Sequence, residues 1–438
     1  MVYNRCEKKS QGGSTMIYEF NFKNFRSYKS SAGIDFTAKP IGEFKESLII
    51  QKADNTELLP VCAIYGPNGG GKSSVLFALL ALRNIIIEPL VQMVFMKRKN
   101  EKLASLSIEE LQDTIKPIAI GDEYYKWDSK CSNEPTEFSI LFSLENHKYR
   151  YEISLLNNMI YEENLFFEDL ETGDMCSIFE RDREEIYLDE RLQSIDIEQI
   201  NESLPIISYI SMLKNIAVID EVVKFFLRIQ IVDFDRPAQD RRILVSALER
   251  NKKQILNILN SMGIEICDIN IEYAEDGKVK NVYTKHILEN GSQKELRFEE
   301  ESSGTRKIFS ILPVILNVIK SGNLLVIDEL DAKLHPVLLQ GIIEMFTNPM
   351  INVKGAQLLF TSHDLTTMNN KVFRRDEIWF SAINAYDESV LYSLVDFRKE
   401  NGDKPRNDEN YNKQYLEGRY GADPYMHKIQ NWEEIECH

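Results

Sequence analysis

The sequence predicts an α/β protein whose main sheet is mostly parallel, with a second, antiparallel part. Two observations favour this fold class. Apolar strands alternate with helices from about residue 305 to residue 382, an order typical of parallel sheets. A glycine-rich stretch near residue 66 follows a short apolar run of the kind that forms buried parallel strands. With 438 residues, 43% of them apolar, the chain is long enough for two or three lobes.

The first predicted element is a pair of antiparallel strands within residues 16–36. Tyr18 and Phe20 alternate with polar side chains in the two-residue period of a half-buried strand, and Ser30–Gly33 marks a turn. The residues before this pair are polar and show no period. We therefore expect a disordered or non-native extension over residues 1–15, with Met16 as the natural start.

The glycine-rich stretch fits the pattern GxxxxGK[ST] between a strand and a helix. Glycines allow successive backbone amides to converge on phosphate oxygens, and the helix start adds the positive end of its dipole. We expect the lysine to neutralise β- and γ-phosphate charge and the first serine to offer its hydroxyl to Mg²⁺. The predicted nucleotide-binding residues are Gly66, Pro67, Asn68, Gly69, Gly70, Gly71, Lys72, Ser73 and Ser74.

The middle of the chain, residues 86–295, is predicted to form an inserted and mainly helical lobe. Phe138–Leu156 alternates as a hairpin, and residues 266–298 predict strands with turns at Asp276–Gly277 and Asn290–Gly291. We expect these strands to continue the antiparallel sheet of the N-terminal part.

The C-terminal part alternates between helices and apolar strands. Its predicted helices are 305–320, 336–347 and 364–370, and its predicted strands are 323–329, 356–363 and 376–382. The expected organisation is an extension (1–15), the first half of a head (16–85), the inserted lobe (86–295), the second half of the head (296–400) and a tail (401–438).

Two of the predicted strands end in groups suited to catalysis. Leu324–Asp331 ends in adjacent acids, which are costly in a buried strand unless they are paired or bound to metal. Asp328 is placed to hold Mg²⁺, and Glu329 to act as a general base toward water. His363 follows another apolar strand and is the candidate group for sensing the γ-phosphate. The alternative is that these are solvated side chains at strand ends.

A second anion site is predicted at the start of helix 305–320. Acidic residues run into Ser-Ser-Gly-Thr and then into a long apolar helix, so Ser302 or Ser303 serves as the helix cap. With Gly304, they leave the first helical amides free for a phosphate. The alternative is an ordinary capped helix.

The order of these four motifs resembles the ATP-binding-cassette (ABC) ATPase head of transporters, SMC and RecF proteins and OLD-like nucleases. This resemblance implies that the serine-glycine signature of one subunit caps the γ-phosphate bound by another, so that ATP joins a head-to-tail dimer or a higher homo-oligomer. Ser302 and Gly304 match the signature, whereas Ser303, Glu301 and Thr305 depart from it. The implied fold is an α/β ABC-type head, with a P-loop sheet and an antiparallel subdomain, carrying the inserted lobe. The implied ligands are ATP and Mg²⁺.

The sequence Leu330–Pro336 after the acids, and Phe20–Tyr28 near the start, resemble RecF-like and OLD-like ATPases more than transporters. Arg26 falls near the nucleotide in such heads. Together with the tail Tyr415–Ile429, these motifs resemble the prokaryotic RloA/AbiLi-type ATPases. That resemblance implies an anti-phage defence regulator that controls an effector encoded nearby, such as a nuclease or TOPRIM-like protein.

Composition limits the alternatives. The net charge of −17 counts against non-specific nucleic-acid binding, although residues 151–200 hold much of it, with 15 Asp or Glu against 3 Arg. The basic clusters at 97–102 and 235–242 are interpreted as solvated connectors. Six cysteines without zinc or disulfide spacing predict reduced thiols.

Two other classes of function remain open from the sequence. A RecF/SMC-like DNA-repair or DNA-binding ATPase would bind nucleic acid, and a transporter ATPase would have a transporter-like signature. The sequence lacks an apolar signal core and 18 consecutive apolar residues, so we expect a cytoplasmic protein without a membrane span.

Overall fold

The computed structural model describes residues 15–99, 121–183, 185–197, 200–232, 237–275, 279–398, 402 and 404–422. Several expectations from the sequence lie outside these ranges. They are the extension before Thr15, the turn at Asp276–Gly277, residues 100–102 and 235–236 of the two basic clusters, and the tail after residue 422.

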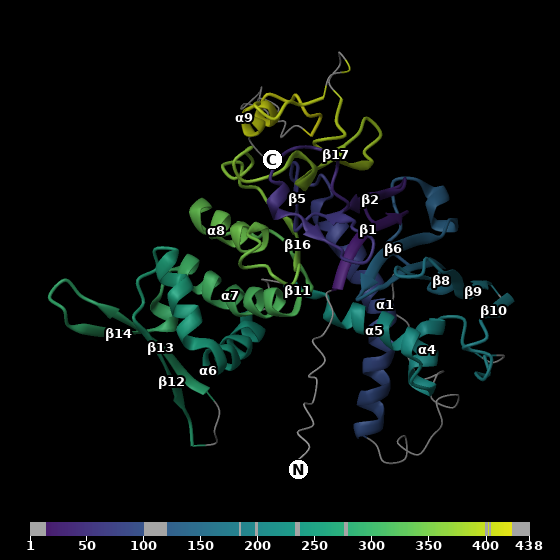
Figure 1. Ribbon diagram of the computed structural model, residues 1–438, viewed down its shortest axis with the longest axis horizontal. Helices are drawn as coiled ribbons and strands as arrows, with labels where there is room; N and C mark the ends of the chain where they lie inside the picture. Colours follow the sequence, from purple (N-terminus) through teal and green to yellow (C-terminus); the bar gives the residue numbers. More distant parts are fainter. Residues whose placement is uncertain are drawn as a thin grey trace, which may run out of the picture.

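The core of the chain is a six-stranded, mostly parallel sheet (Figure 1). Its strands are β5 (Val61–Tyr65), β11 (Gln230–Val232), β15 (Leu324–Ile327), β16 (Gln357–Thr361), β17 (Ile378–Ile383) and β18 (Ser389–Ser393). Their order in the sheet is β11-β15-β16-β5-β17-β18, and only the β17–β18 pair is antiparallel. Every residue of β5, β15 and β16 is buried, as expected when both faces of a parallel sheet are covered.

Helices cover both faces of this sheet. They are α1 (Lys72–Lys99), α4 (Ile206–Leu213), α5 (Ala217–Arg228), α6 (Pro237–Ser261), α7 (Ser303–Ser321) and α8 (Pro336–Thr347), with a short α9 (Tyr411–Leu416) near the end of the described chain. Cys62 and Ile64 of β5 pack in one apolar cluster with α1, α4 and α5. Val61, Ala63 and Tyr65 face the other cluster, which contains α6, α7 and α8.

A seven-stranded antiparallel sheet packs in the first cluster, beside α1 (Figure 1). Its strands are β1 (Thr15–Lys23), β2 (Ala32–Asp35), β6 (Thr136–Leu144), β7 (His147–Leu156), β8 (Met159–Asp169), β9 (Met175–Asp182) and β10 (Glu185–Leu188). The order β10-β9-β8-β7-β6-β1-β2 joins the first predicted strands to the hairpin predicted within the inserted lobe. A separate two-stranded sheet consists of β3 (Ile49–Ile50) and β4 (Glu57–Leu58).

A three-stranded antiparallel sheet extends away from the body at the left of Figure 1. It consists of β12 (Asp268–Tyr273), β13 (Val279–Ile287) and β14 (Gln293–Arg297). The last strand leads through a short 3-10 helix, η4 (Phe298–Glu300), into the start of α7. Other 3-10 turns are η1 (Lys45–Ser47), η3 (Ser129–Asn133) and η5 (Arg375–Glu377).

These elements confirm the predicted ABC-type α/β head, in which a P-loop sheet lies beside an antiparallel subdomain. The prediction for residues 86–295 needs correction, because this segment contains strands β6 to β14 as well as helices and is not mainly helical. Strands β6 to β10 complete the head's antiparallel sheet, and β11 joins the core sheet by pairing with β15. The prediction that the strands within residues 266–298 also continue the antiparallel sheet is wrong, because among the described strands β12, β13 and β14 pair only with one another. Long-range strand pairing therefore decides how much of this segment belongs to the head.

The predicted helix at residues 364–370 is wrong, since this segment forms bends and turns. The carboxylate of Asp364 accepts hydrogen bonds from the backbone amides of Thr366 and Thr367, each at 3.1 Å. Such local side-chain bonds compete with helix formation. The loop after β16 is therefore held by Asp364 rather than by a helical turn.

Among the described residues, α1 is the helix long and apolar enough to cross a membrane, judged by length and composition alone. Its most apolar window is 56% buried within the protein. Val75, Leu79 and Leu82 of α1 pack in the cluster between the two sheets. Helix α1 is therefore interpreted as a core helix, which can meet the same criteria of length and composition as a membrane span.

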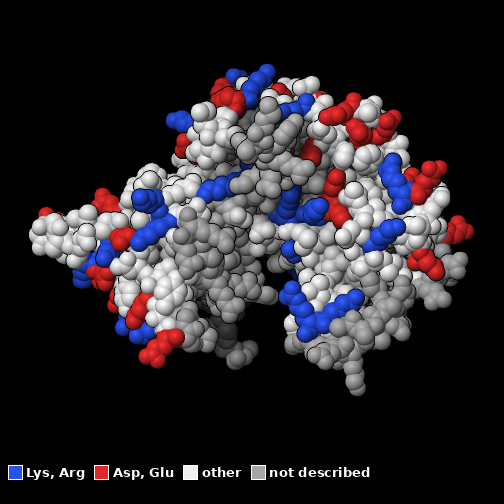
Figure 2. Space-filling model, turned by 60° about the horizontal axis from the view of Figure 1, so that its bottom comes forward, with Lys and Arg blue, Asp and Glu red and all other residues white. Residues whose placement is uncertain are grey.

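The face shown in Figure 2 is hollowed between the part that bears the three-stranded sheet and the part that bears the antiparallel sheet. Lys and Arg side chains border this hollow, whereas most Asp and Glu side chains on this face lie toward its outer rim. Charged side chains are therefore unevenly distributed over this face.

Candidate functional site

The P-loop occupies the turn between the end of β5 and the start of α1. Gly66 has φ 156°, and a Cβ there would lie 2.1 Å from the carbonyl oxygen of Ser381 on the neighbouring strand β17. At Gly71, with φ 98°, a Cβ would lie 2.5 Å from Ser389 Oγ and 2.7 Å from Ser27 Oγ. These two positions therefore require glycine. Asn68 and Gly69 form the exposed tip of the loop.

A chain of buried hydroxyls supports the loop from below. Ser381 Oγ donates its one hydrogen to the carbonyl oxygen of Gly70 at 2.5 Å. In its bond with Tyr28, at 2.7 Å, Ser381 Oγ is therefore the acceptor and the Tyr28 hydroxyl is the donor. Burial raises the pKa of Tyr28, which therefore stays a neutral donor. Both supporting residues lie far from the P-loop in sequence, and no local pattern marks them.

The loop between β1 and β2 contacts the P-loop from the side. Ser27 Oγ donates to Ser74 Oγ at 3.3 Å. The adjacent Arg26, at φ 50°, pairs with Glu123 at 2.7 Å, and its guanidinium lies 4.2 Å from the ring centre of Phe77, one turn further along α1. Arg26 therefore lies beside the P-loop helix, next to the residue that contacts Ser74.

Lys72 is buried, and its ammonium group folds back onto the P-loop. Lys72 Nζ donates to the carbonyl oxygens of Gly66 and Pro67, each at 3.0 Å. Burial lowers the pKa of Lys72, while the nearby charges of Asp328 and Glu329 act in the opposite direction. These contacts place the positive charge of Lys72 at the loop predicted to hold phosphates.

Asp328 follows the end of β15 and lies opposite the P-loop serine. Ser73 Oγ donates to Asp328 Oδ1 at 3.1 Å, and Thr361 Oγ1 donates to the same oxygen at 2.5 Å. A hydroxyl beside a carboxylate is an oxygen-rich pair of the kind that Mg²⁺ prefers. Ser73 and Asp328, the two predicted metal ligands, are therefore adjacent.

Glu329 lies at the exposed end of the same strand. Its φ of 48° falls in the left-handed region, and its backbone amide donates to Thr361 Oγ1 at 2.7 Å. This conformation is strained for glutamate and is held by the surrounding bonds. The Glu329 side chain is 58% exposed, so its carboxylate remains accessible.

His363 follows the end of β16 and faces Glu329. Its Nε2 lies 3.9 Å from Glu329 Oε1, and the His363 side chain is 40% exposed. The His363 amide donates to Asp331 Oδ1 at 3.1 Å. Two of the three predicted catalytic side chains, Glu329 and His363, thus lie side by side at the same edge of the sheet as Asp328, and the third is Lys72.

Thr361 is a candidate positioning residue that the sequence analysis missed. Its single hydroxyl accepts from the Glu329 amide and donates to Asp328, so it orients both acids while being fully buried. The motif Thr-Ser-His-Asp contained it, but only the parallel pairing of β15 and β16 brings it to Asp328.

We expect Thr361→Val to lower ATP turnover about tenfold to hundredfold, the range for losing a hydrogen bond to a charged group. Valine has nearly the shape of threonine, so the buried site stays filled. Thr361→Ser keeps the hydroxyl and should retain most of the activity. Steady-state phosphate release with matched circular dichroism spectra measures this difference. Equal activity in the two variants would contradict a positioning role for the hydroxyl.

The predicted signature lies at the start of α7, on the same edge of the fold as Glu329. Ser302 is the N-cap of α7, and its Oγ accepts from the Thr305 amide at 3.0 Å. Ser302 and Ser303 are exposed. A Cβ on Gly304 would lie 2.9 Å from the carbonyl oxygen of Lys333, so α7 closely approaches the loop after Glu329.

Lys307 joins the signature helix to the acidic strand end. Its Nζ donates to the carbonyl oxygen of Glu329 at 3.1 Å and to that of Ala332 at 2.6 Å. Burial lowers the pKa of Lys307 to about 8, against the opposing charges of Asp331 and Glu329. The first turn of α7 is therefore tied to the backbone of the loop that carries Glu329.

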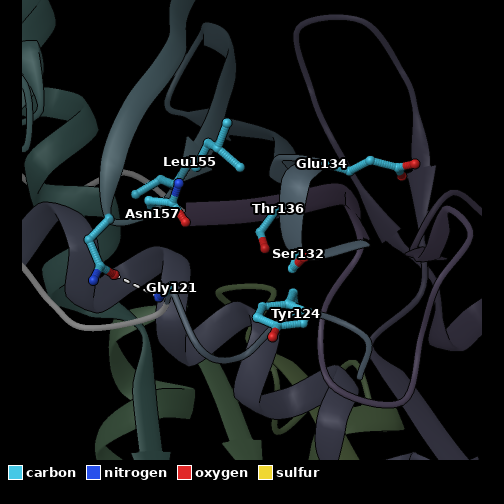
Figure 3. A pocket seen from close by; sticks show the side chains of 9 residues that line it. Gly121, Tyr124, Ser132, Glu134, Thr136, Leu155 and Asn157 are labelled. Carbon is cyan, nitrogen blue, oxygen red and sulfur yellow. Dashed lines mark hydrogen bonds between the residues drawn. The ribbon is translucent and has the colours of Figure 1, made fainter. Parts of the chain in front are cut away.

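A small cavity beside the β7–β8 turn is unsuited to a nucleotide (Figure 3). The Gly121 amide donates to Asn158 Oδ1 at 2.6 Å across its edge. Its volume of about 10 Å³ corresponds to about one water molecule. The residues that line it are Gly121, Tyr124, Ser132, Glu134, Thr136, Leu155, Leu156, Asn157 and Asn158.

With this geometry in place, comparison with known proteins identifies the family. The family model described as "AAA domain, putative AbiEii toxin, Type IV TA system" matches residues 61–369, more than two thirds of the chain. The chain belongs to this family. The matched range begins in β5, before the P-loop, and ends after His363, so it contains all four motifs of this chain. The protein is accordingly a member of a nucleotide-binding ATPase family with an ABC-type head.

No curated protein matches the chain. Solved structures similar to it include the SMC head domain from Thermotoga maritima, with 13% identity and a TM-score of 0.40, covering 86% of this chain and 98% of that one. An SMC head bound to the C-terminal winged-helix domain of ScpA has 12% identity and a TM-score of 0.43, with 86% and 98% coverage. The SMC head domain with a coiled coil and joint from Pyrococcus yayanosii has 11% identity and a TM-score of 0.40, with 87% and 97% coverage.

Proposed function

We propose that this protein binds and hydrolyses ATP with Mg²⁺ at a composite site formed by two copies arranged head to tail. The observation that carries the proposal is the placement of the signature. Ser302 and Ser303 are exposed at the start of a long helix, on the edge that bears the acids, and the hydrogen bonds of Ser302 are with its own helix turn. This leaves the helix start accessible to a γ-phosphate held by a second copy.

The residues present fit ATP and Mg²⁺. Side chains at Gly66 and Gly71 would collide with neighbouring oxygens, so the loop keeps a bare backbone whose amides suit phosphate oxygens. Ser73 and Asp328 would hold Mg²⁺, which neutralises phosphate charge when bound. Lys72 would exchange its two carbonyl partners for phosphate oxygens.

Within this site, Glu329 accepts a proton from the attacking water as general base. Thr361 fixes the backbone of Glu329 and the carboxylate of Asp328. His363 lies beside Glu329, where it would contact the γ-phosphate of bound ATP and respond to its cleavage. Because Lys307 ties α7 to Glu329, opening of one site moves the signature that serves the other site.

The proposed biological role is that of a cytoplasmic regulator in an anti-phage defence system. The family description names a toxin–antitoxin system, and the RloA/AbiLi-like motifs of the sequence point in the same direction. In this role the ATP cycle controls an effector encoded in trans, a nuclease or TOPRIM-like protein.

The test of the composite site is the oligomeric mass of Glu329→Gln, measured with and without ATP and Mg²⁺. We expect an ATP-dependent dimer, because slow hydrolysis preserves the capped state. Adding Ser302→Arg should abolish the dimer, since a long cation replaces the capping hydroxyl. Ser310→Arg, two turns along the same helix, is the matched control and should leave the dimer intact. The proposal would be contradicted if the oligomeric mass of Glu329→Gln were the same with and without ATP, or if Ser302→Arg left the ATP-dependent dimer intact.

The alternative function is a RecF/SMC-like DNA-binding ATPase, and one observation favours it. Lys and Arg side chains border the hollow seen in Figure 2, which offers a path for a phosphate backbone. This alternative predicts that double-stranded DNA stimulates hydrolysis and that the stimulation falls steeply with salt. Hydrolysis that is unaffected by DNA at low salt would exclude it.

A further inference from the structure

The three-stranded sheet is joined to the signature by a nearly buried acid. Glu301 immediately precedes Ser302, and its side chain is 8% exposed. Glu301 Oε1 accepts from His286 Nε2 at 2.6 Å and from the Thr284 hydroxyl. Both partners belong to β13, the central strand of the projecting sheet.

These contacts are specific to one face of β13. Thr284 and His286 are two residues apart, so their side chains point to the same side of the strand. Lys285 between them points to the other side and pairs with Glu295 of β14 at 3.2 Å. The sheet therefore offers a donor pair to Glu301 and an unrelated ion pair on its opposite face.

The position of Glu301 gives this contact a consequence for the signature. Ser302 is the N-cap whose Oγ accepts from Thr305, and its placement depends on the backbone that enters α7. That backbone is fixed on one side by Glu301 and, through an edge-to-face contact of 5.6 Å between ring centres, by Phe298 against Phe309 of α7. A shift of β13 thus shifts the start of α7.

We propose that Glu301, held by Thr284 and His286, is a positioning residue that aims the signature helix start at the γ-phosphate, so that the three-stranded sheet controls ATP-dependent closure of the dimer. This inference rests on the proposed composite site and deepens it. A partner protein that binds the projecting sheet would then raise or lower the rate of ATP hydrolysis by moving β13.

The first test measures how firmly the start of α7 is held, in the monomer and without nucleotide. In Thr284→Val, whose side chain keeps the shape but lacks the hydroxyl, we expect hydrogen exchange of the first-turn amides of α7 to quicken severalfold. Thr284→Ser should exchange like the wild type. His286→Ala should act like Thr284→Val, and Lys285→Ala, the matched control on the opposite face, should act like the wild type. Unchanged exchange in both Thr284→Val and His286→Ala would overturn the proposal.

The second test measures ATP-dependent dimerisation, with each substitution combined with Glu329→Gln. We expect Thr284→Val and His286→Ala to raise the ATP concentration needed for dimerisation about tenfold, roughly the effect of losing one hydrogen bond to a charged group. The affinity of the monomer for ATP should stay unchanged in both variants, because the P-loop is untouched. Thr284→Ser should dimerise like the Glu329→Gln parent. Normal dimerisation in both variants would overturn the coupling claim.

The two tests separate this inference from the proposed function. If Glu329→Gln itself fails to dimerise with ATP, the composite site is wrong, and the coupling claim falls with it. If Glu329→Gln dimerises but the β13 variants match Lys285→Ala, the composite site stands and the coupling claim alone falls.

Discussion

Glu329→Gln should reduce ATP turnover by about 10²- to 10⁴-fold, the range that positioned general bases contribute. The amide keeps the size of the side chain but cannot accept a proton from water. The carboxylate is exposed at the end of β15, and Thr361 holds its backbone in a strained conformation, so the group is placed for chemistry rather than for stability. Phosphate release under single-turnover conditions measures the loss.

ATP affinity should change little in Glu329→Gln, because the P-loop and Lys72 are untouched. Glu344→Gln on the exposed face of α8 is the matched control and should turn over ATP at the wild-type rate. Residual turnover within threefold of the wild type would assign the general base to another residue.

Lys72→Ala should weaken ATP binding about tenfold to hundredfold, because charge-assisted bonds to phosphate are lost. A second effect reinforces the first, since the ammonium also bonds the Gly66 and Pro67 carbonyls that shape the loop. Isothermal titration with a slowly hydrolysed ATP analogue measures the affinity.

Lys72→Arg is the informative companion variant. It keeps the charge, but its planar guanidinium does not fit the two carbonyl contacts of a compact ammonium group, so we expect affinity close to that of Lys72→Ala. Wild-type affinity in Lys72→Ala would show that phosphate charge is neutralised by another cation, for which Arg26 beside the P-loop helix is a candidate.

The parts of the fold that depend on local pattern were predictable from the sequence. The P-loop is marked by its glycines, β15 and β16 by short apolar runs, and α8 begins at Pro336 and ends at Thr347, as its period indicated. Local hydrophobic period and turn chemistry are sufficient for such elements.

The parts that depend on long-range contact were not predictable. Thr361 reaches Asp328 only because β15 and β16 pair in parallel, and Tyr28 supports the P-loop through Ser381, which lies 353 residues away from it in the sequence. The helix predicted at 364–370 fails because the Asp364 side chain captures nearby amides. The inserted lobe was expected to be mainly helical because its strands, which are spread along the chain, reveal their partners only in the folded sheets.

The head-to-tail composite site is tested most directly by mixing two defective variants, Lys72→Ala and Ser302→Arg, and measuring ATP turnover at an ATP concentration too low to saturate Lys72→Ala. In a mixed dimer, one site pairs the intact P-loop of the Ser302→Arg copy with the intact signature of the Lys72→Ala copy. With random exchange of subunits and independent sites, the equimolar mixture should recover about a quarter of wild-type activity. Turnover in the mixture no higher than the average of the two separate variants would contradict the composite site.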